Sequence, residues 1–195
     1  MGRPPKIDLR DNILNAASEK FFRLGCSRVS IDELVSDIHT SKSAVYKYFS
    51  SKEDLINAVI IHMNENINTN IGLIVNDKSI SFQKKLEDIM YFTTKVLQKV
   101  SKDFLDDLKI NYSKIWKEYL EMRKDRLNKL YLKFFKEGIK QGYIRKDVPV
   151  GFLLIVYTKL TEIVVDPAIR ETIDVNIKDA YETITRLFLE GANPE

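Results

Sequence analysis

Apolar positions along most of this chain recur with the spacing of an amphipathic helix, and a clear short example begins after Ser30. Glu33 follows three residues later, a pairing that caps helix N-termini, so a helix should begin at Ile31. Its apolar stripe is formed by Ile31, Leu34, Val35 and Ile38. After a three-residue break, a second short helix is expected over about residues 42–49. Two short helices joined by such a turn predict a helix-turn-helix.

The outward face of the second short helix carries hydroxyl and basic side chains and no carboxylate, as a surface that meets phosphates should. Its members are Ser41, Lys42, Ser43, Tyr46, Lys47 and Tyr48. A helix of this length can lie in a major groove of DNA. The same pattern also fits a pair of core helices with a solvated basic face, so the residues after Phe49 matter for the choice.

A further capping pair, Ser50 with Glu53, predicts that a long helix opens after Phe49. The surrounding stretch resembles the DNA-binding signature of the TetR/AcrR family of transcriptional regulators at Ser41, Val45, Tyr46, Phe49, Lys52, Glu53 and Leu55, and upstream at Ile13, Leu14, Ala16, Ala17, Phe21, Phe22, Gly25, Val29, Ser30, Ile31 and Leu34. The similarity covers about the first 60 residues. It implies a homodimer, a two-fold DNA operator, repression that a small-molecule effector relieves, and no cofactor.

The chain departs from the family pattern at five positions. His39 stands where relatives usually carry glycine, so it either adopts a left-handed backbone conformation or contacts a phosphate. Thr40 replaces a usual valine, and Val35 and Ile38 replace usual alanines, which affects how the two short helices pack. Cys26 replaces a usual aromatic residue and is either a small buried apolar side chain or a redox sensor. A single cysteine cannot form an intrachain disulfide, which fits a reducing cytosol.

Long segments with helical periodicity fill the rest of the chain. They cover about residues 8–24, 51–75, 81–100, 102–110, 113–142, 150–165 and 175–190. Together with the two short helices they predict an all-α fold of about nine helices. We expect an N-terminal helix-turn-helix domain over residues 1–52, with a basic arm at its start, and a helical effector-binding and dimerisation domain over residues 53–195.

Charge is distributed unevenly between these two parts. Residues 1–52 hold 9 Lys and Arg against 6 Asp and Glu, whereas residues 53–195 hold 22 of each, so the net charge of +3 lies with the helix-turn-helix. Arg3 and Lys6 lie in a proline-containing start that is either a solvated tail or an arm that reaches DNA. This distribution favours nucleic acid as the partner.

The motif also predicts which side chains contact DNA. We expect Ser41, Lys42, Ser43 and Ala44 to face bases, Tyr46, Lys47 and Tyr48 to hold phosphates, Ser30 and Lys52 to help at helix N-termini, and Arg3 and Lys6 to contribute from the arm. The operator is therefore expected to be double-stranded DNA that is read in the major groove.

Residues typical of catalysis or metal binding are missing. His39 and His62 are far apart, neither has a second ligand at metal spacing, and no phosphate-binding glycine motif occurs. We therefore expect no enzyme activity, no metal and no cofactor. The chain lacks an apolar run of signal or membrane-spanning length, which predicts a cytoplasmic protein without a membrane partner.

The helix over residues 150–165 is apolar nearly all round, so it must be covered on two sides, and a second copy of the chain would supply one of them. The expected dimer interface comprises Leu160, Ile163, Val164, Ala180, Tyr181, Ile184 and Phe188. A different hypothesis is a helical dimer or partner-binding module whose headpiece no longer reads DNA sequence.

The expected effector pocket is lined by aromatic side chains of the second domain. The candidates are Tyr91, Phe92, Tyr112, Trp116, Tyr119 and Tyr157, and the alternative interpretation is that these rings only fill the core. The charges of residues 118–125, Arg123 among them, are expected to form a solvated face. With no buried charge expected, the predicted effector is an apolar or aromatic compound.

Overall fold

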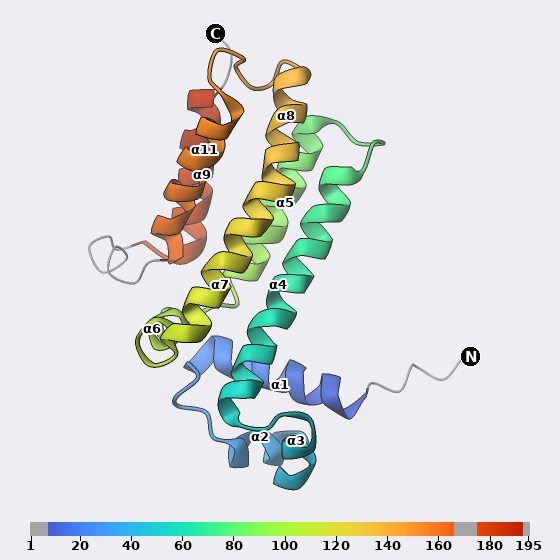
Figure 1. The fold of residues 1–195 in the computed structure, drawn as a ribbon, viewed down its shortest axis with the longest axis vertical. Coiled ribbons are helices and arrows are strands. Elements are labelled where there is room, and N and C mark those ends of the chain that lie inside the picture. Colours follow the sequence, from blue (N-terminus) through green and yellow to red (C-terminus); the bar gives the residue numbers. More distant parts are fainter. Residues whose placement is uncertain (1–7, 166–174, 193–195) are drawn as a thin grey trace. The chain divides into compact units, whose positions relative to one another are not determined.

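A computed structural model describes residues 8–165 and 175–192 of the 195-residue chain, and all its regular structure in these ranges is helical (Figure 1). The helices are α1 (Leu9–Leu24), α2 (Ile31–Asp37), α3 (Lys42–Tyr48), α4 (Lys52–Asn76), α5 (Phe82–Leu97), α6 (Lys102–Asn111), α7 (Ser113–Arg126), the π-helix η1 (Leu127–Tyr131), α8 (Leu132–Lys140), α9 (Val150–Val165) and α11 (Ile177–Ala192). When the continuous run from α7 to α8 is counted once, these ranges contain nine helices. The all-α prediction is confirmed.

Most helix boundaries lie close to those that the periodicity predicts, and α9 begins and ends at the predicted residues. Two differences matter. Helix α5 ends at Leu97, before the predicted end near residue 100, and the predicted helix over 113–142 contains the π-helical turn η1. A π-helical turn inserts an extra residue into a helix and is common at functional sites, but hydrophobic periodicity does not reveal it.

Helix capping agrees with the sequence at α2 and differs at α4. The Glu33 amide donates to Ser30 Oγ (3.1 Å), and the Ser30 amide donates to Glu33 Oε2 (2.8 Å), as a capping box requires. The predicted pair of Ser50 with Glu53 is wrong by one residue. Instead, the Asp54 amide donates to Ser51 Oγ (3.0 Å), and the Ser50 amide donates to the Asp54 carboxylate (2.8 Å). Adjacent serines make both registers possible, and the one completed by Asp54 forms.

The chain divides into two compact units. The first comprises residues 1–63 and 99–116, and the second comprises residues 64–98 and 117–195. Helix α6 therefore belongs to the same unit as the helix-turn-helix, although it lies far along the sequence. The functional boundary at residue 52 was placed from the motif, and it stays a prediction.

The first unit has a small core that joins α1, α2, α3 and the start of α4. Its buried side chains include Ile13, Leu14, Ala17, Phe21, Leu34, Val45, Phe49, Leu55 and Ile56. Lys20 of α1 forms an ion pair with Asp37 of α2 (2.8 Å), and the Phe22 ring meets the Phe104 ring of α6 edge to face, with centroids 4.9 Å apart. These contacts give the helix-turn-helix a fixed scaffold.

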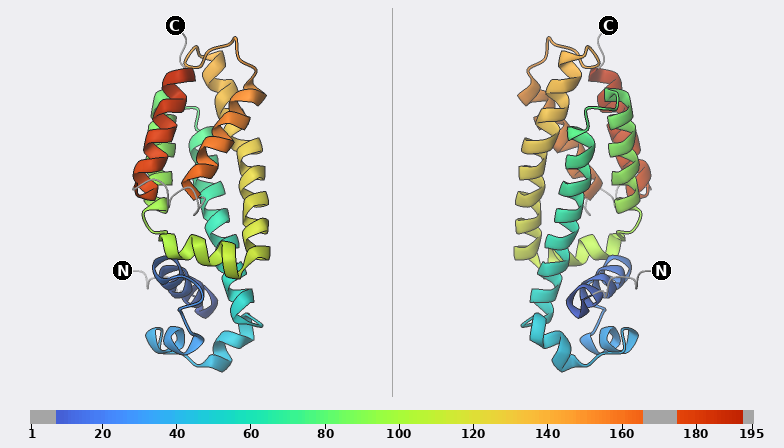
Figure 2. Two further views of the ribbon diagram at one scale, coloured as in Figure 1. Left: turned by 90° about the vertical axis from the view of Figure 1, so that its left-hand side faces the viewer. Right: turned by 90° about the vertical axis from the view of Figure 1, so that its right-hand side faces the viewer.

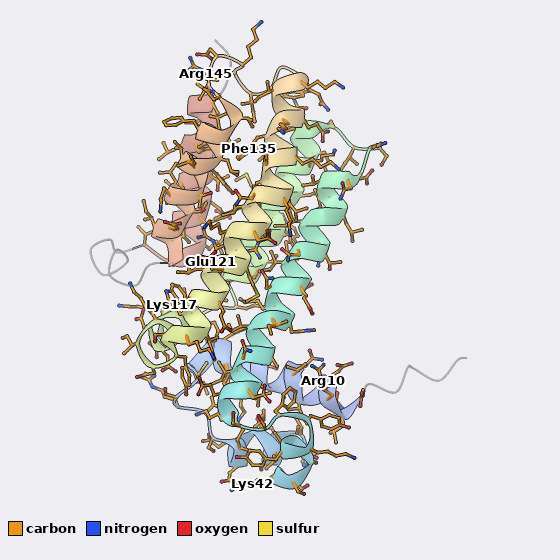
Figure 3. All side chains as sticks on the ribbon, in the orientation of Figure 1. Arg10, Lys42, Lys117, Glu121, Phe135 and Arg145 are labelled. Atoms are coloured by element: carbon orange, nitrogen blue, oxygen red, sulfur yellow. The ribbon has the colours of Figure 1, made fainter. Side chains whose placement is uncertain are left out.

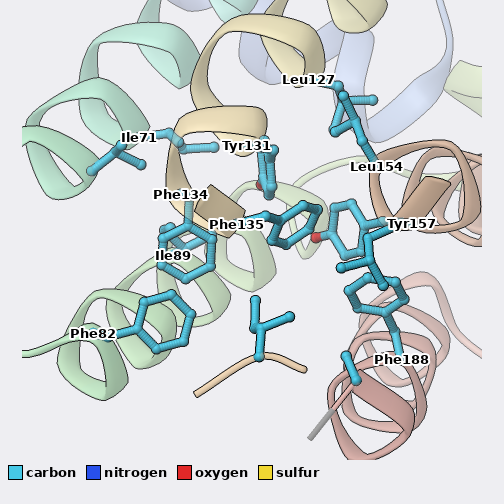
Figure 4. Close-up of a cluster of buried hydrophobic side chains, with 14 residues drawn as sticks. Ile71, Phe82, Ile89, Leu127, Tyr131, Phe134, Phe135, Leu154, Tyr157 and Phe188 are labelled. Carbon is cyan, nitrogen blue, oxygen red and sulfur yellow. The ribbon is translucent and has the colours of Figure 1, made fainter. Parts of the chain in front are cut away.

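The second unit has an aromatic core, shown in Figure 4. Phe135 is in its middle, with ring centroids 5.5 Å from both Tyr157 of α9 and Phe188 of α11, and Tyr131 stacks on Tyr157 at 5.2 Å. Helix α11 packs against α9 and α5, which Figure 2 shows beside it in both views. No helix of the described ranges combines the length and the apolar character that crossing a bilayer requires.

Candidate nucleic-acid interface

Helix α3 is held by two buried side chains and presents the rest to solvent. Val45 and Phe49 are 1% and 2% exposed, because their spacing of four residues places both on the inner face. Tyr46, Lys47 and Tyr48 are exposed on the other side. The sequence prediction of an outward polar face on a short, anchored helix is therefore confirmed.

The turn between α2 and α3 depends on His39. Its φ angle is 50°, which is the left-handed region, and the Thr40 amide donates to the Val35 carbonyl oxygen (3.0 Å). Of the two interpretations of this residue, the left-handed conformation is the one observed. A histidine tolerates this region at a cost that glycine avoids, so the turn carries some backbone strain.

Side chains at the start of α3 are already engaged within the unit. The Ala44 amide donates to Ser41 Oγ (3.1 Å), which also lies 2.9 Å from Ser43 Oγ. Lys42 Nζ lies 2.8 Å from Asp32 Oδ1 of α2, and this hydrogen bond raises the pKa of Lys42. Asp32 thus brings a carboxylate beside a helix that has none of its own, which sequence reasoning missed because it treated each helix face separately.

Two residues that were predicted to bind phosphate also have partners. Both the amide and the hydroxyl of Ser30 donate to the Glu33 carboxylate, which lowers the pKa of Glu33. Lys52 Nζ donates to the Ser27 carbonyl oxygen (3.3 Å). Lys47 differs from these, because it is exposed and pairs with no carboxylate of the residues that the structure describes. It is therefore the cation of α3 that is directly available to a phosphate.

One further cation lies next to α3. The Arg10 guanidinium of α1 is 5.7 Å from the centre of the Phe49 ring, and the Arg10 side chain is about half exposed (49%). Figure 3 labels Arg10 and Lys42 in this unit. Sequence reasoning missed Arg10, although its place at the start of α1, directly after the basic arm, was a usable signal. Arg3 and Lys6 of that arm lie outside the described residues.

Cys26 has a structural role in this unit. Its side chain is fully buried, and burial raises the pKa of the thiol to about 12. Because the thiolate is the reactive form, such a cysteine is inert at neutral pH. The interpretation of Cys26 as a small buried apolar residue agrees with this environment.

The residues expected at a dimer interface divide into two groups. Val164, Ala180, Tyr181 and Phe188 are buried within the single chain, whereas Leu160, Ile163 and Ile184 are partly exposed. The most exposed large apolar side chains of these helices are instead Phe152 and Ile155 of α9 and Leu187 of α11. The interface itself stays a prediction, and these exposed side chains lie on the helices that it names.

The residues expected around an effector are not gathered in one unit. Tyr112 and Trp116 belong to the first unit, and Tyr91, Phe92, Tyr119 and Tyr157 belong to the second. Tyr157 fills the aromatic core, as the contacts above show. Tyr91 lines an open groove of about 620 Å³ between α5 and α11. The effector site therefore stays a prediction.

The fold and this interface together define a class of protein, namely a helix-turn-helix DNA-binding protein with a second helical unit. Within the described ranges, no group of three acidic, histidine or cysteine side chains could hold a metal ion. A sequence profile of bacterial regulatory proteins of the tetR family matches residues 13–59, which include α2 and α3. The helix-turn-helix domain of the chain therefore belongs to the tetR family of bacterial regulatory proteins.

Among curated proteins, the nucleoid occlusion factor SlmA of Shewanella baltica is 26% identical over 84 residues, which is 43% of either chain. The match thus spans less than half the length of these relatives. Solved structures match almost the whole chain. The regulatory protein TetR from Rhodobacter sphaeroides is 18% identical with a TM-score of 0.70, covering 95% of this chain and 100% of that one. The fatty acid degradation regulator FadR from Bacillus halodurans is also 18% identical with a TM-score of 0.70, covering 98% of both. These likenesses show a shared fold.

Proposed function

We propose that this regulator is a repressor that binds a palindromic operator as a homodimer and leaves it when a small molecule binds. The observation that carries the proposal is the exposed face of α3. Its tyrosines and Lys47 stand on a short helix that Val45 and Phe49 anchor in the core. A short anchored helix with a cationic face suits the major groove.

The two ends of α3 have different tasks in this proposal. Ser41, Lys42, Ser43 and Ala44, at the N-terminal end, read base edges, because recognition helices of this type enter the groove with that end first. Tyr46, Lys47 and Tyr48 hold phosphates, with Arg10, Ser30 and Lys52 nearby and Arg3 and Lys6 reaching from the arm. Asp32 keeps the Lys42 ammonium in place until a base or a phosphate competes for it.

A homodimer is supported by apolar side chains that the single chain leaves exposed. Phe152, Ile155 and Leu187 each expose about 60% of their surface on α9 and α11. Burying them against a second copy would remove this apolar area from water. Two-fold symmetry would then place two copies of α3 over half-sites roughly 34–36 Å apart, which is why the operator is expected to be palindromic.

We infer a division of labour along the chain, with DNA binding in residues 1–52 and dimerisation and effector binding in residues 53–195. A ligand changes operator affinity only when it binds one conformation of the dimer better than the other. The open grooves of the second unit, such as that beside Tyr91, offer places for a ligand. The protein would act in the cytoplasm, where its operator is accessible.

The test is sequence-specific binding under competition. Labelled DNA from upstream of the gene for this protein is titrated with the full chain at about 150 mM salt, in excess unlabelled competitor DNA. Specific operators are typically bound 10³–10⁷ times more tightly than other DNA, so binding should survive the competitor. Binding that competitor abolishes, and that depends only on salt, would instead favour a partner-binding module that no longer reads DNA sequence.

A further inference from the structure

Two arginines are buried inside the second unit, three residues apart on α7. Arg123 and Arg126 are each only 8% exposed. This corrects the sequence expectation that the charges around Arg123 form a solvated face. The neighbouring Lys124 fits that expectation, with 66% of its side chain exposed. Helical periodicity places both arginines on the inner face of α7. The many charged residues around them in the sequence do not indicate this.

The partners of the two arginines are neutral. Arg123 Nη2 donates to Thr161 Oγ1 of α9 (2.7 Å), and Arg126 Nη1 donates to Asn64 Oδ1 of α4 (2.5 Å). Neither forms an ion pair with any carboxylate in the part of the chain that the structure describes. A guanidinium has five N–H donors, so one neutral hydrogen bond leaves most of its bonding capacity unused. Burying such a cation without a counter-charge is costly.

The surroundings of Arg126 are rich in hydroxyl groups and contain a second cation. Burial lowers the pKa of Arg126, and the charge of Arg123 lowers it further, whereas the phenols of Tyr119, Tyr131 and Tyr181 act in the opposite sense. The π-helical segment η1 begins directly after Arg126 and ends at Tyr131. Two like charges beside phenols, at an irregular helical turn, are typical of a binding site rather than of an apolar core.

A groove leads to Arg123, the first of the two arginines. Arg123 lines a groove of about 380 Å³ between α7 and α9, whose apolar members are Leu120, Leu127, Leu154 and Ile155. Its two carboxylates already have cations of their own, since Glu121 pairs with Lys124 (3.7 Å) and Glu162 pairs with Lys159 (2.9 Å). Both carboxylates at the groove thus have a cation beside them, whereas neither arginine pairs with a carboxylate of residues 8–165 or 175–192.

We propose that the second unit binds a small organic oxyanion, whose carboxylate or phosphate head accepts hydrogen bonds from Arg123 and Arg126 and whose apolar part lies in the α7–α9 groove. Guanidinium groups match both head groups in geometry, and a groove of this volume suits a small molecule. The claim that this anion is the effector rests on the proposed function, whereas the binding site itself does not. It replaces the uncharged apolar or aromatic compound expected from the sequence.

Binding is measured first by calorimetry on the full chain without DNA. The probes are octanoate, octyl phosphate and 1-octanol, which share a chain and differ in the head. At least one of the two anions should bind about tenfold or more tightly than the alcohol, and comparing them tells a carboxylate head from a phosphate head. Equal binding of all three, or no binding by either anion, would overturn the proposal.

Arg126→Met and Arg123→Met test the residues, and Lys117→Met is the matched control, because it removes an exposed charge from the same helix outside the lining of the groove. The arginine variants should bind the anion about 10- to 100-fold more weakly and bind 1-octanol with unchanged affinity. The control variant should bind both probes like the wild type. Arg126→Met should also melt no lower than the unliganded wild type, because it removes a buried unpaired charge. A marked fall in its melting temperature, with anion binding retained, would show a purely structural arginine.

A second arm separates this proposal from the proposed function. The anion that binds is added to the complex of the protein with its operator, and DNA affinity is followed. Anion binding without DNA release would leave the site in place and contradict the effector role. DNA release by another compound, with no anion bound at Arg123 and Arg126, would contradict the site and leave the effector mechanism intact.

Discussion

Lys42 Nζ lies 2.8 Å from Asp32 Oδ1, so the first cation of the recognition helix α3 is held by a carboxylate of the preceding helix. Both side chains are exposed, at 54% and 69%, which makes the ion pair weak in water and easily exchanged. The pair therefore positions Lys42 before DNA arrives, and it also places a negative charge where phosphates or base edges come close.

Replacing Asp32 with asparagine should tighten DNA binding. The change removes a repulsive charge and frees Lys42, so we expect affinity to rise about two- to fivefold at low salt and less at high salt, where charges are screened. Fluorescence anisotropy over a salt series measures this. Asp125→Asn is the matched control, because Asp125 forms a comparable exposed pair with Lys129 (2.6 Å) in the second unit. Weaker binding by Asp32→Asn would mean that the pair is needed to orient Lys42.

Lys47 and Lys42 should respond differently to truncation. Lys47→Ala should weaken binding to all sequences alike and reduce the slope of log affinity against log salt by about 0.9, as the loss of one phosphate contact does. Lys42→Ala should change which base is preferred. Binding to a set of operator variants separates the two effects. If both substitutions scale every affinity by one factor, Lys42 does not read a base.

The helix-turn-helix could be predicted almost residue by residue, because its signals are local. The cap at Ser30, the left-handed turn at His39 and the anchors Val45 and Phe49 each depend on neighbours within a few positions. What the sequence could not show depends on distant contacts. Asp32 meets Lys42 across a turn, and α6 joins the first unit although α4 and α5 separate it from the helix-turn-helix in sequence.

Buried charges were the main failure of prediction in the second unit. Arg123, Arg126 and Lys85 stand among other charged residues in the sequence, and they are buried in the fold. Their hydrogen-bond partners lie on other helices, namely α9, α4 and α8. The irregular turn η1 was missed for a related reason, since a one-residue insertion in a helix shifts the inward face without changing composition. Such features come from tertiary packing, which periodicity within one helix does not report.

The ion pair of Lys85 with Glu137 should be important for stability. Lys85 Nζ is buried and donates to both Glu137 carboxylate oxygens, at 2.8 and 2.9 Å, and to the Val75 carbonyl oxygen. Lys85→Met should lower the free energy of unfolding by about 3 kcal/mol, the low end for such pairs, because Glu137 is 24% exposed. Urea denaturation measures this. Adding Glu137→Met should recover much of the loss, and full additivity of the two changes would contradict the coupling.

Because of Cys26, the free energy of unfolding should fall as the pH rises, but only at alkaline pH. Burial raises the pKa of its thiol to about 12, so above pH 9 the unfolded chain loses this proton while the folded chain keeps it. The free energy of unfolding should therefore decline between about pH 9 and 12, by at most about 1.4 kcal/mol per pH unit, relative to Cys26→Ala. Denaturation of both proteins across this range, with labelling of the native thiol at pH 8, checks the prediction. Rapid labelling at pH 8 would contradict the burial.

A charge on the exposed face of α9 should disrupt the dimer. Ile155 is 60% exposed, and Ile155→Glu should give monomers by light scattering, because the carboxylate cannot be buried against a second copy. Leu73→Glu is the matched control, since Leu73 is exposed to a similar degree (68%) on α4. That variant should stay dimeric. Dimers from Ile155→Glu would place the interface elsewhere, and the partly exposed Leu160 and Ile184 would be tested next.

The central claim is that two helix-turn-helix units, one from each copy, read DNA sequence together. A hydroxyl-radical footprint tests it most directly, with the full chain on DNA from upstream of its own gene, at about 150 mM salt and with competitor DNA. The account predicts two protected half-sites related by a two-fold axis, with centres separated by about one helical turn or a multiple of it. It also predicts that Lys47→Ala weakens both protections equally. A single protected site, or protection that spreads without preference along the fragment, would contradict the account.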